Sequence, residues 1–368
     1  MSKLGDLGAR LHRGEISYDF VGKRKIWYGI SILITITAIV GLAVRGLNMG
    51  IEFQGGAVFT TPTKMSTSVA QAEDYANQAS GHQSVAQKLG NGSLRIQIAG
   101  IDTDQSNKVK QELAKDLNLD PEKLAADLVG PSWGEQIASK AWEGLAIFMV
   151  LVVIYLAIAF EWRMAVAALV ALIHDITITT GIYALVGFEV TPGTVIGLLT
   201  ILGYSLYDTV VVFDSLKEQT KDITKQTRFT YSDIANRSIN GTLVRSINTT
   251  VVALLPVAGL LFIGGGFLGA GTLNDISLSL FVGLAAGAYS SIFIATPLVA
   301  DLKEREPAMK ALTKRVLAKR AQAATDEDAA QARTGDDDTD DAAPAVVGPR
   351  NQPASRNRGR GRTSGKRR

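Results

Sequence analysis

The sequence contains no cysteine and only three histidines, His12, His82 and His174, which lie far apart in the chain. The lack of cysteine excludes disulfides, thiolate ligands and thiol nucleophiles, and scattered histidines leave too few ligands for a structural zinc site. The sequence also lacks a phosphate-binding glycine loop and a nucleophile elbow. These absences argue against an enzyme that acts on a bound small substrate, and we expect neither a cofactor nor a metal.

Net charge is also low. It amounts to +3, from 38 basic and 35 acidic side chains among 368 residues. A hydrophobic content of 46% looks ordinary, but it averages several very apolar segments with two polar regions. Apolar segments of about 20 residues are long enough to cross a bilayer, so the composition predicts a membrane protein.

Six apolar segments are predicted to be transmembrane helices. The first follows a basic stretch, which is also typical of a signal peptide, but the apolar core of a signal peptide is usually shorter, about 7–15 residues. The G-x-x-x-G patterns Gly193 to Gly197 and Gly283 to Gly287 are typical of closely packed helices. The predicted spans are residues 26–45, 139–160, 163–186, 190–214, 240–263 and 276–300.

Basic residues mark one side of these spans. They cluster in the N-terminal segment 1–25, in the predicted loop 215–240 and after Asp301, whereas the connections 187–190 and 264–275 carry none. The positive-inside bias therefore predicts that both termini are cytoplasmic and that the polar region after the first span faces outward. We expect a multi-pass protein of the plasma membrane.

Residues 46–137 are predicted to form a small extracytoplasmic α+β domain. Extended and helical patterns alternate here, and a Gly90-Asn91-Gly92 turn separates two strands. The order β-α-β-β-α-β predicts a ferredoxin-like sandwich. The expected elements are an extended segment over 50–61, a helix over 68–80, strands over 84–88 and 93–99, a helix from an Asp102 or Thr103 cap to about Leu117, and a strand over 124–129.

A polar tail, residues 301–368, ends the chain. A short basic helix to about Ala323 precedes an acidic, alanine-rich run and an arginine- and glycine-rich end. This composition does not supply a core, so a cytoplasmic and mostly disordered tail is predicted. The basic end is typical of an electrostatic arm for anionic lipid, the ribosome or an acidic partner; a solvated tail without a defined partner is the alternative.

An acid, Asp208, lies within the predicted fourth span. An ionised carboxylate at the bilayer centre costs about 2.5–3.5 kcal/mol on insertion scales, so Asp208 is a candidate functional residue. Counting about 1.5 Å per residue from the nearer helix ends places Asp208 and Arg245 at similar depths, roughly 8–9 Å. We therefore predict an ion pair in which movement of Arg245 makes Asp208 take up or release a proton. A static ion pair that holds two helices together is the alternative.

His174 and Asp175 of the predicted third span lie deeper, near the level of Tyr204 and Tyr289, roughly 14–18 Å from the helix ends. Because His174 and Asp175 are adjacent on one helix, we do not expect them to face each other, although both can face the bundle interior. Histidine titrates near neutral pH and suits a proton relay, whereas a core histidine bonded to a backbone carbonyl is the alternative. The predicted proton pathway comprises Asp208, Arg245, His174, Asp175 and Tyr204.

Several separated strings resemble the SecD/SecF family of protein-export membrane proteins, within the resistance-nodulation-division superfamily. Together they cover about residues 15–305. Glu52 stands where that family usually has Asp, and Tyr207 where it has Asn. The strings are DFVGKRKIW before the first span, GIEFQGG after it, HD in the third, GYSLYDTVVVFD in the fourth, NRSINGTLVRSINTT in the fifth and GAYSSIFIATPL in the sixth.

This resemblance implies pairing with SecD, association with the SecYEG channel and with YajC and YidC, and contact with translocating preprotein. In the family, SecD and SecF are understood to use the proton gradient to help draw preproteins outward after the ATP-driven step. The resemblance places Asp208 and Arg245 in the proton pathway. It also assigns Phe53, Gly55 and Gly56 to the motif that joins the external domain to the first span.

We therefore expect an auxiliary translocase subunit that couples the proton-motive force to late-stage preprotein translocation. Two other functions stay open at this point. A proton-coupled small-molecule exporter of the same superfamily also has six spans in each half, but with much larger external domains than residues 46–137 can form. A non-transporting scaffold of a membrane complex would tolerate loss of the Asp208 carboxylate.

Overall fold

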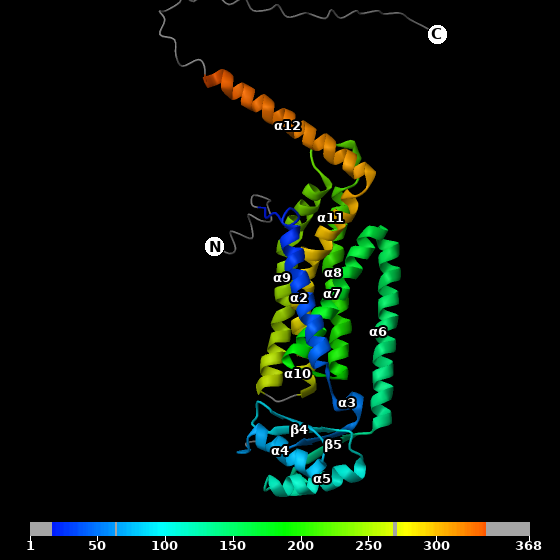
Figure 1. The fold of residues 1–368 in the computed structure, drawn as a ribbon, viewed down its shortest axis with the longest axis vertical. Coiled ribbons are helices and arrows are strands. Elements are labelled where there is room, and N and C mark those ends of the chain that lie inside the picture. The colour runs from blue at the N-terminus through cyan, green and yellow to red at the C-terminus, as the bar shows by residue number, and fades with distance from the viewer. Residues whose placement is uncertain (1–16, 63–64, 268–270, 336–368) are drawn as a thin grey trace, which may run out of the picture. The chain divides into compact units, whose positions relative to one another are not determined.

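A computed structural model describes residues 17–62, 65–267 and 271–335. The chain divides into two compact units, residues 1–317 and residues 318–368. Six of the described helices are long and apolar enough to cross a membrane, which agrees with the six predicted spans. In the first unit these helices run side by side, and a small sheet with its helices covers one end of the bundle (Figure 1).

The spanning helices follow the predicted apolar segments but extend beyond several of them. α6 begins at Pro131, so the predicted boundary at residue 138 is wrong, and the predicted loop 215–240 shrinks to residues 220–230. A capping box between Thr230 and Asp233 begins the fifth span well before its apolar run, because helix ends follow caps rather than hydropathy. The spans are α2 (Arg24–Arg45), α6 (Pro131–Ala159), α7 (Trp162–Val186), α8 (Pro192–Gln219), α9 (Tyr231–Gly259) with the π-helical segment η3 (Leu260–Phe267), and α10 (Gly271–Ser290) with the π-helical turn η4 (Ser291–Ala295) and α11 (Thr296–Glu304).

The segment between α2 and α6 forms an α/β domain, residues 56–129. Its strands form one antiparallel sheet in the order β3-β4-β2-β5, and its elements occur in the predicted order β-α-β-β-α-β. The core under this sheet includes Phe59, Ile96 and Leu113. The elements are β2 (Gly56–Thr60), α4 (Val69–Ser80), β3 (Ser84–Lys88), β4 (Leu94–Ala99), α5 (Thr103–Asp116) and β5 (Ala125–Val129).

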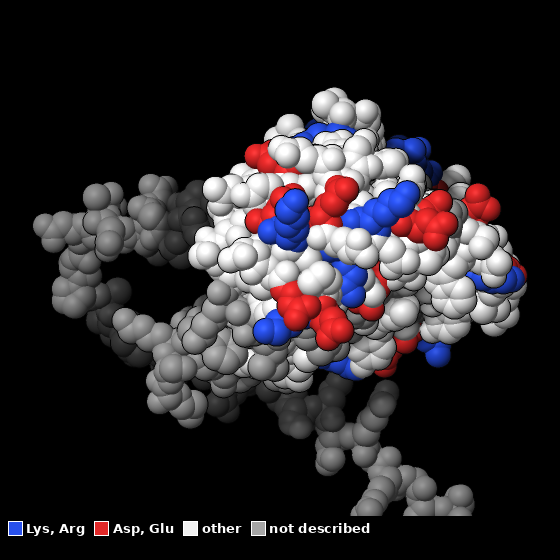
Figure 2. Space-filling view, turned by 90° about the horizontal axis from the view of Figure 1, so that it is seen from below, with Lys and Arg blue, Asp and Glu red and all other residues white. Residues whose placement is uncertain are grey.

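The outer face of the α/β domain carries charges of both signs. α5 buries Val109 and Leu113 against the sheet and leaves Lys108 and Glu112 exposed. Figure 2 views this end of the molecule and shows basic and acidic side chains interspersed over it. Interspersed charges are typical of a solvated surface and produce no extended field of one sign.

Glycines allow two spanning helices to pack closely. A Cβ atom added at Gly197 of α8 would lie 1.8 Å from Ser279 Oγ, and one at Gly283 of α10 would lie 2.1 Å from Ile201 Cδ1. Both glycines belong to the predicted G-x-x-x-G patterns, and each faces the partner helix. The packing interpretation of these patterns is therefore confirmed for α8 and α10.

The C-terminal helix is longer than predicted. α12 (Pro307–Gly335) includes the basic segment and continues into the acidic, alanine-rich run that was expected to be disordered. The alanine, glutamate, glutamine and arginine residues of this run favour a helix even without a core, which explains the extension. The disorder predicted for residues 336–368 concerns a segment that lies outside the described residues.

The close contact of α8 and α10 can be tested with Gly283→Ala. We expect a loss of about 1–3 kcal/mol in stability, because the added methyl group forces buried Ile201 out of its place. The measurement is the thermal unfolding midpoint of the purified protein in detergent. Gly203→Ala on α8 is the matched control, since a Cβ there meets nothing within 4 Å. Equal midpoints for both variants would contradict the tight-packing explanation.

Candidate functional site

Asp208 of α8 is buried in the helix bundle with only 4% of its surface exposed. Its Oδ1 accepts a hydrogen bond of 2.6 Å from Ser246 Oγ of α9. Its Oδ2 accepts a hydrogen bond from the hydroxyl of Ser291, the first residue of η4. Two neutral hydroxyl donors from two other helices therefore hold this carboxylate.

Asp175 of α7 forms a second buried carboxylate of the same kind, with 1% of its surface exposed. Its Oδ2 accepts hydrogen bonds from Ser205 Oγ at 2.5 Å and from Ser290 Oγ at 2.8 Å. Its Oδ1 lies 3.5 Å from His174 Nδ1. The prediction that His174 and Asp175 do not face each other is therefore wrong. Both side chains lean into the same space between α7 and the sixth span.

The predicted ion pair between Asp208 and Arg245 does not occur among the described residues. Arg245 is exposed on α9, and its Nη2 donates a hydrogen bond of 3.0 Å to the hydroxyl of Tyr207, which is 50% exposed. The next residue, Ser246, faces Asp208 instead. Successive residues of a helix point about 100° apart, so a position at the level of Asp208 did not guarantee that Arg245 faces it. The hydroxyl of Tyr207 is therefore the hydrogen-bond partner of Arg245.

Two tyrosines flank this centre without joining it. Tyr204 is partly buried, and its hydroxyl faces Thr250 of α9 without reaching hydrogen-bond geometry. Tyr289 stacks on the His174 ring at 6.1 Å between centroids and shares a hydrogen bond of 2.9 Å with Ser31 Oγ of α2. The Nε2 atom of His174 is buried without a hydrogen-bond partner in the described structure.

Four serines complete the site, and none of them is among the predicted pathway residues. Serine is common in transmembrane helices, where its hydroxyl usually bonds to the preceding turn, so it carries little signal of its own. A signal was nevertheless present, because Ser205 precedes Asp208 by three residues and so shares its helix face. The four are Ser205, Ser246, Ser290 and Ser291.

The motif residues Phe53, Gly55 and Gly56 lie where the α/β domain meets the bundle. Phe53 belongs to the short helix α3 (Ile51–Gln54), so the extended conformation predicted over 50–61 is wrong for these four residues. Gly55 ends α3 with φ +77°, and Gly56 has φ +139°. A Cβ on Gly56 would lie 2.2 Å from the Ile98 carbonyl oxygen, so only glycine fits at the start of β2.

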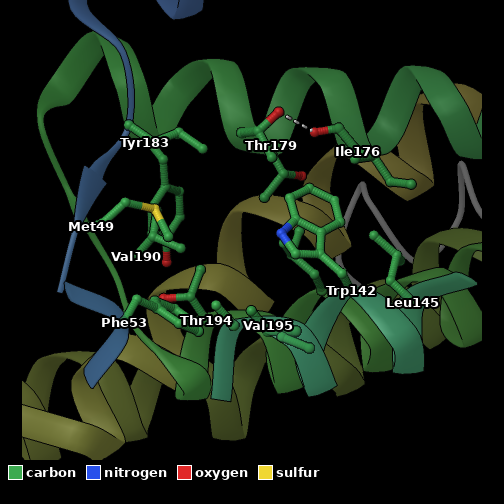
Figure 3. A pocket seen from close by; sticks show the side chains of 15 residues that line it. Met49, Phe53, Trp142, Leu145, Ile176, Thr179, Tyr183, Val190, Thr194 and Val195 are labelled. Atoms are coloured by element: carbon green, nitrogen blue, oxygen red, sulfur yellow. Dashed lines mark hydrogen bonds between the residues drawn. The ribbon is translucent and has the colours of Figure 1, made fainter. Parts of the chain in front are cut away.

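An apolar pocket lies beside this junction. Phe53 packs with Tyr183 of α7 and with Val190 in a small apolar cluster. Figure 3 shows Met49 and Phe53 at one end of the pocket and Trp142 and Leu145 of α6 at the other. Apolar contacts of this kind join the linker after α2 to α6, α7 and α8.

Two short strands strengthen the same junction. β1 (Asn48–Met49), which follows α2, pairs in parallel with β6 (Glu189–Val190), which connects α7 to α8. Glu189 is buried, and one of its carboxylate oxygens accepts a hydrogen bond of 2.8 Å from Gln97 Nε2 of β4. Burial raises the pKa of Glu189, whereas the Gln97 hydrogen bond and the charge of Arg95 act in the opposite direction.

The fold and site define a multi-pass membrane protein with paired acids buried in its helix bundle. Residues 108–305 match the family described as "Protein export membrane protein SecD/SecF, C-terminal", and residues 40–67 match the "SecD/SecF GG Motif". The chain belongs to the SecD/SecF family of protein export membrane proteins.

The similarity to known proteins extends over the whole chain. The chain is 80% identical to protein translocase subunit SecF of Streptomyces coelicolor over 373 residues, which covers 100% of both chains. It is 42% identical to protein translocase subunit SecF of Mycobacterium tuberculosis, over 87% of this chain and 75% of that one. The crystal structure of SecDF from Thermus thermophilus has a TM-score of 0.69 at 29% identity and covers 81% of this chain and 42% of that one.

The buried acid at the junction predicts a pH dependence. The pKa of Glu189 is raised in the folded protein. Its protonation therefore stabilises the junction fully below the ordinary carboxyl pKa, and this stabilisation is lost as pH rises through the raised pKa. We expect amide protection of β1 and β6 in hydrogen exchange, corrected for intrinsic rates, to fall with rising pH. Glu189→Gln should make this protection independent of pH. Glu135→Gln, which removes an exposed acid of α6, is the control and should leave the pH dependence as it is. An unchanged pH dependence in Glu189→Gln would show that Glu189 is not its cause.

Proposed function

We propose that this chain is an auxiliary subunit of the Sec protein translocase that acts with SecD to couple the proton-motive force to late-stage preprotein translocation. Family membership and 80% identity to a protein translocase subunit SecF support this role. The proposal places the protein in the plasma membrane with both termini in the cytoplasm. The positive-inside pattern of the sequence supports that orientation.

The observation that carries the proposal is the set of partners of Asp208. A serine hydroxyl can donate a hydrogen bond to an ionised carboxylate, and it can accept one from a protonated carboxyl group. An arginine could satisfy only the ionised form, because guanidinium has no acceptor. Ser246 and Ser291 therefore satisfy Asp208 in both protonation states, as a reversible proton carrier inside a membrane requires.

Arg245 has a different role in this proposal from the one expected. It is exposed next to Tyr207 and holds no acid among the described residues, so it lies at the edge of the proton pathway rather than at its centre. His174 and Asp175 continue the pathway on the side of α7, and Tyr204 borders it from α8. One charge that moves through 100 mV yields about 2.3 kcal/mol, enough to bias a conformational equilibrium.

Pairing with SecD is supported by relatives in which both parts form one chain. The chain is 30% identical to protein translocase subunit SecDF of Thermus thermophilus over 80% of its own length, which corresponds to 40% of that protein. We propose that a SecD subunit corresponds to the part of SecDF to which this chain does not align. Contacts with SecYEG, YajC, YidC and preprotein, and of the basic tail with anionic lipid or the ribosome, are part of the proposal through the family relationship.

The α/β domain is proposed to be ferredoxin-like and extracytoplasmic. The antiparallel sheet order β3-β4-β2-β5 with its two crossover helices supports the first part. The lack of basic residues in the neighbouring connection 187–190 supports the second. Its junction with β6 then lies on the outer side, where the protons enter.

The carrier role can be tested with Asp208→Asn in a complex with SecD. Asparagine can accept from one of Ser246 and Ser291 through its oxygen and donate to the other through its amide nitrogen, but it does not bind or release a proton in the physiological pH range. We therefore expect assembly with SecD to survive and the proton-gradient stimulation of preprotein translocation into vesicles to be lost. Glu218→Gln, which removes an exposed acid of the same helix, is the control and should leave the stimulation intact. Full stimulation in Asp208→Asn would refute the proposal.

A further inference from the structure

Two consecutive serines connect the two buried acids. Ser290, the last residue of α10, donates to Asp175 Oδ2 at 2.8 Å, and Ser291, the first residue of η4, donates to Asp208 Oδ2. Both serines are completely buried. The acids themselves belong to different helices, α7 and α8. Two adjacent residues of the sixth span therefore form hydrogen bonds with both carboxylates.

Each of these hydroxyls has a second acceptor within reach on its own helix. Ser290 Oγ lies 3.2 Å from the carbonyl oxygen of Gly287, and Ser291 Oγ lies 3.3 Å from that of Ala288. When a carboxylate binds a proton, it becomes a weaker acceptor, and the hydroxyl can turn to the backbone carbonyl. The acid binds one proton, no bond of the serine breaks, and only the hydrogen bond of the hydroxyl changes its acceptor.

The backbone changes its helical form at the same place. The α-helical pattern of α10 ends at Ser290, the π-helical turn η4 (Ser291–Ala295) follows, and α11 starts at Thr296. Thr296 Oγ1 donates to the carbonyl oxygen of Ser291, five residues before it. Single π-helical turns within α-helices are rare and occur frequently at functional sites. The geometry of this turn sets the directions in which Ser290 and Ser291 point.

Glycine makes room for this arrangement. A Cβ on Gly287, one turn before Ser291, would lie 2.9 Å from Ser205 Cβ. The absence of a side chain at residue 287 thus lets the sixth span approach α8 closely enough for Ser290 and Ser291 to reach both acids. Ser205 itself donates to Asp175, so the same contact also completes the second site.

We propose that Ser290 and Ser291 are positioning residues that couple Asp175 and Asp208 into one proton-binding unit through the π-helical turn η4. Protonation of one acid changes the orientation of its serine and of the shared turn, and thereby changes the proton affinity of the other acid. This inference rests on the proposed function, in which Asp208 binds protons. The other ionisable groups that face the unit are His174 from α7, Tyr204 from α8 and Tyr289 from α10, whereas Arg245 of α9 is turned away.

The test is a titration of the carboxyl groups by infrared spectroscopy in the reconstituted complex with SecD. Asp175→Asn and Asp208→Asn identify the carbonyl band of each acid. In the otherwise unchanged protein, we expect Asp175→Asn to shift the titration midpoint of Asp208. In the double variant Ser290→Ala with Ser291→Ala, most of that shift should be lost. An equally large shift without the serines would overturn the proposal, because it would show direct electrostatic interaction between the acids.

Two further variants separate coupling from a general loss of structure. Ser279→Ala removes a buried hydroxyl of α10, eleven residues before Ser290, that donates to Ile276 O, and should leave the shift intact. Ser291→Thr keeps the hydroxyl and should restore the shift relative to Ser291→Ala. If the threonine variant does not fold, Ser291→Cys, with a weaker donor of similar size, should give an intermediate shift. A loss of the shift in Ser279→Ala, or the absence of rescue at residue 291, would count against the proposal.

The infrared titration does not depend on translocation. If Asp208→Asn leaves the proton-gradient stimulation intact, the proposed function fails, but the coupling of the two acids can still be measured. If the stimulation is lost in Asp208→Asn and the serine variants leave the shift unchanged, only the coupling fails. The two proposals are therefore distinguishable.

Discussion

Hydrogen bonds between two buried carboxylates and four serine hydroxyls are the interactions on which the arrangement of the helix bundle depends. In an apolar interior, every polar group must find its partner within the protein, because no water competes for it and an unpaired group costs several kcal/mol, roughly 2–7. Asp175 and Asp208 therefore restrict how α7, α8, α9 and the sixth span can rotate and slide. Any arrangement that moves one of the serines away removes one of the two serine donors of an acid.

Close packing and polar contact support each other in this bundle. Gly197, Gly283 and Gly287 allow α8 and α10 to approach closely. This close approach lets the short side chains of the serines reach the acids. Serine has only one rotatable bond before its oxygen, so it orders at little entropic cost but tolerates little error in backbone position. The glycines and the serines thus act as one structural unit, although they occupy different positions along the helices.

The junction with the α/β domain is connected to the buried acids through the chain itself. β6 lies between α7 and α8, the helices that carry Asp175 and Asp208, and it pairs with β1 just after α2. Glu189 of β6 also accepts a hydrogen bond from Gln97 within the sheet of the α/β domain. A change in the relative position of α7 and α8 would therefore reach the α/β domain through a strand pair and a buried side chain rather than through a flexible linker.

Sequence alone determined the features that repeat locally along the chain: six apolar spans, the order β-α-β-β-α-β, and the unusual acid Asp208 within a span. It also placed Asp208 and Arg245 at similar depths, because depth depends only on the rise per residue. The tertiary structure decided which way each helix turned, and a difference of one residue, or about 100°, put Ser246 rather than Arg245 against the acid. The pairing of Ser246, Ser290 and Ser291 with the two acids likewise depends on contacts between residues far apart in the chain, which local spacing does not encode.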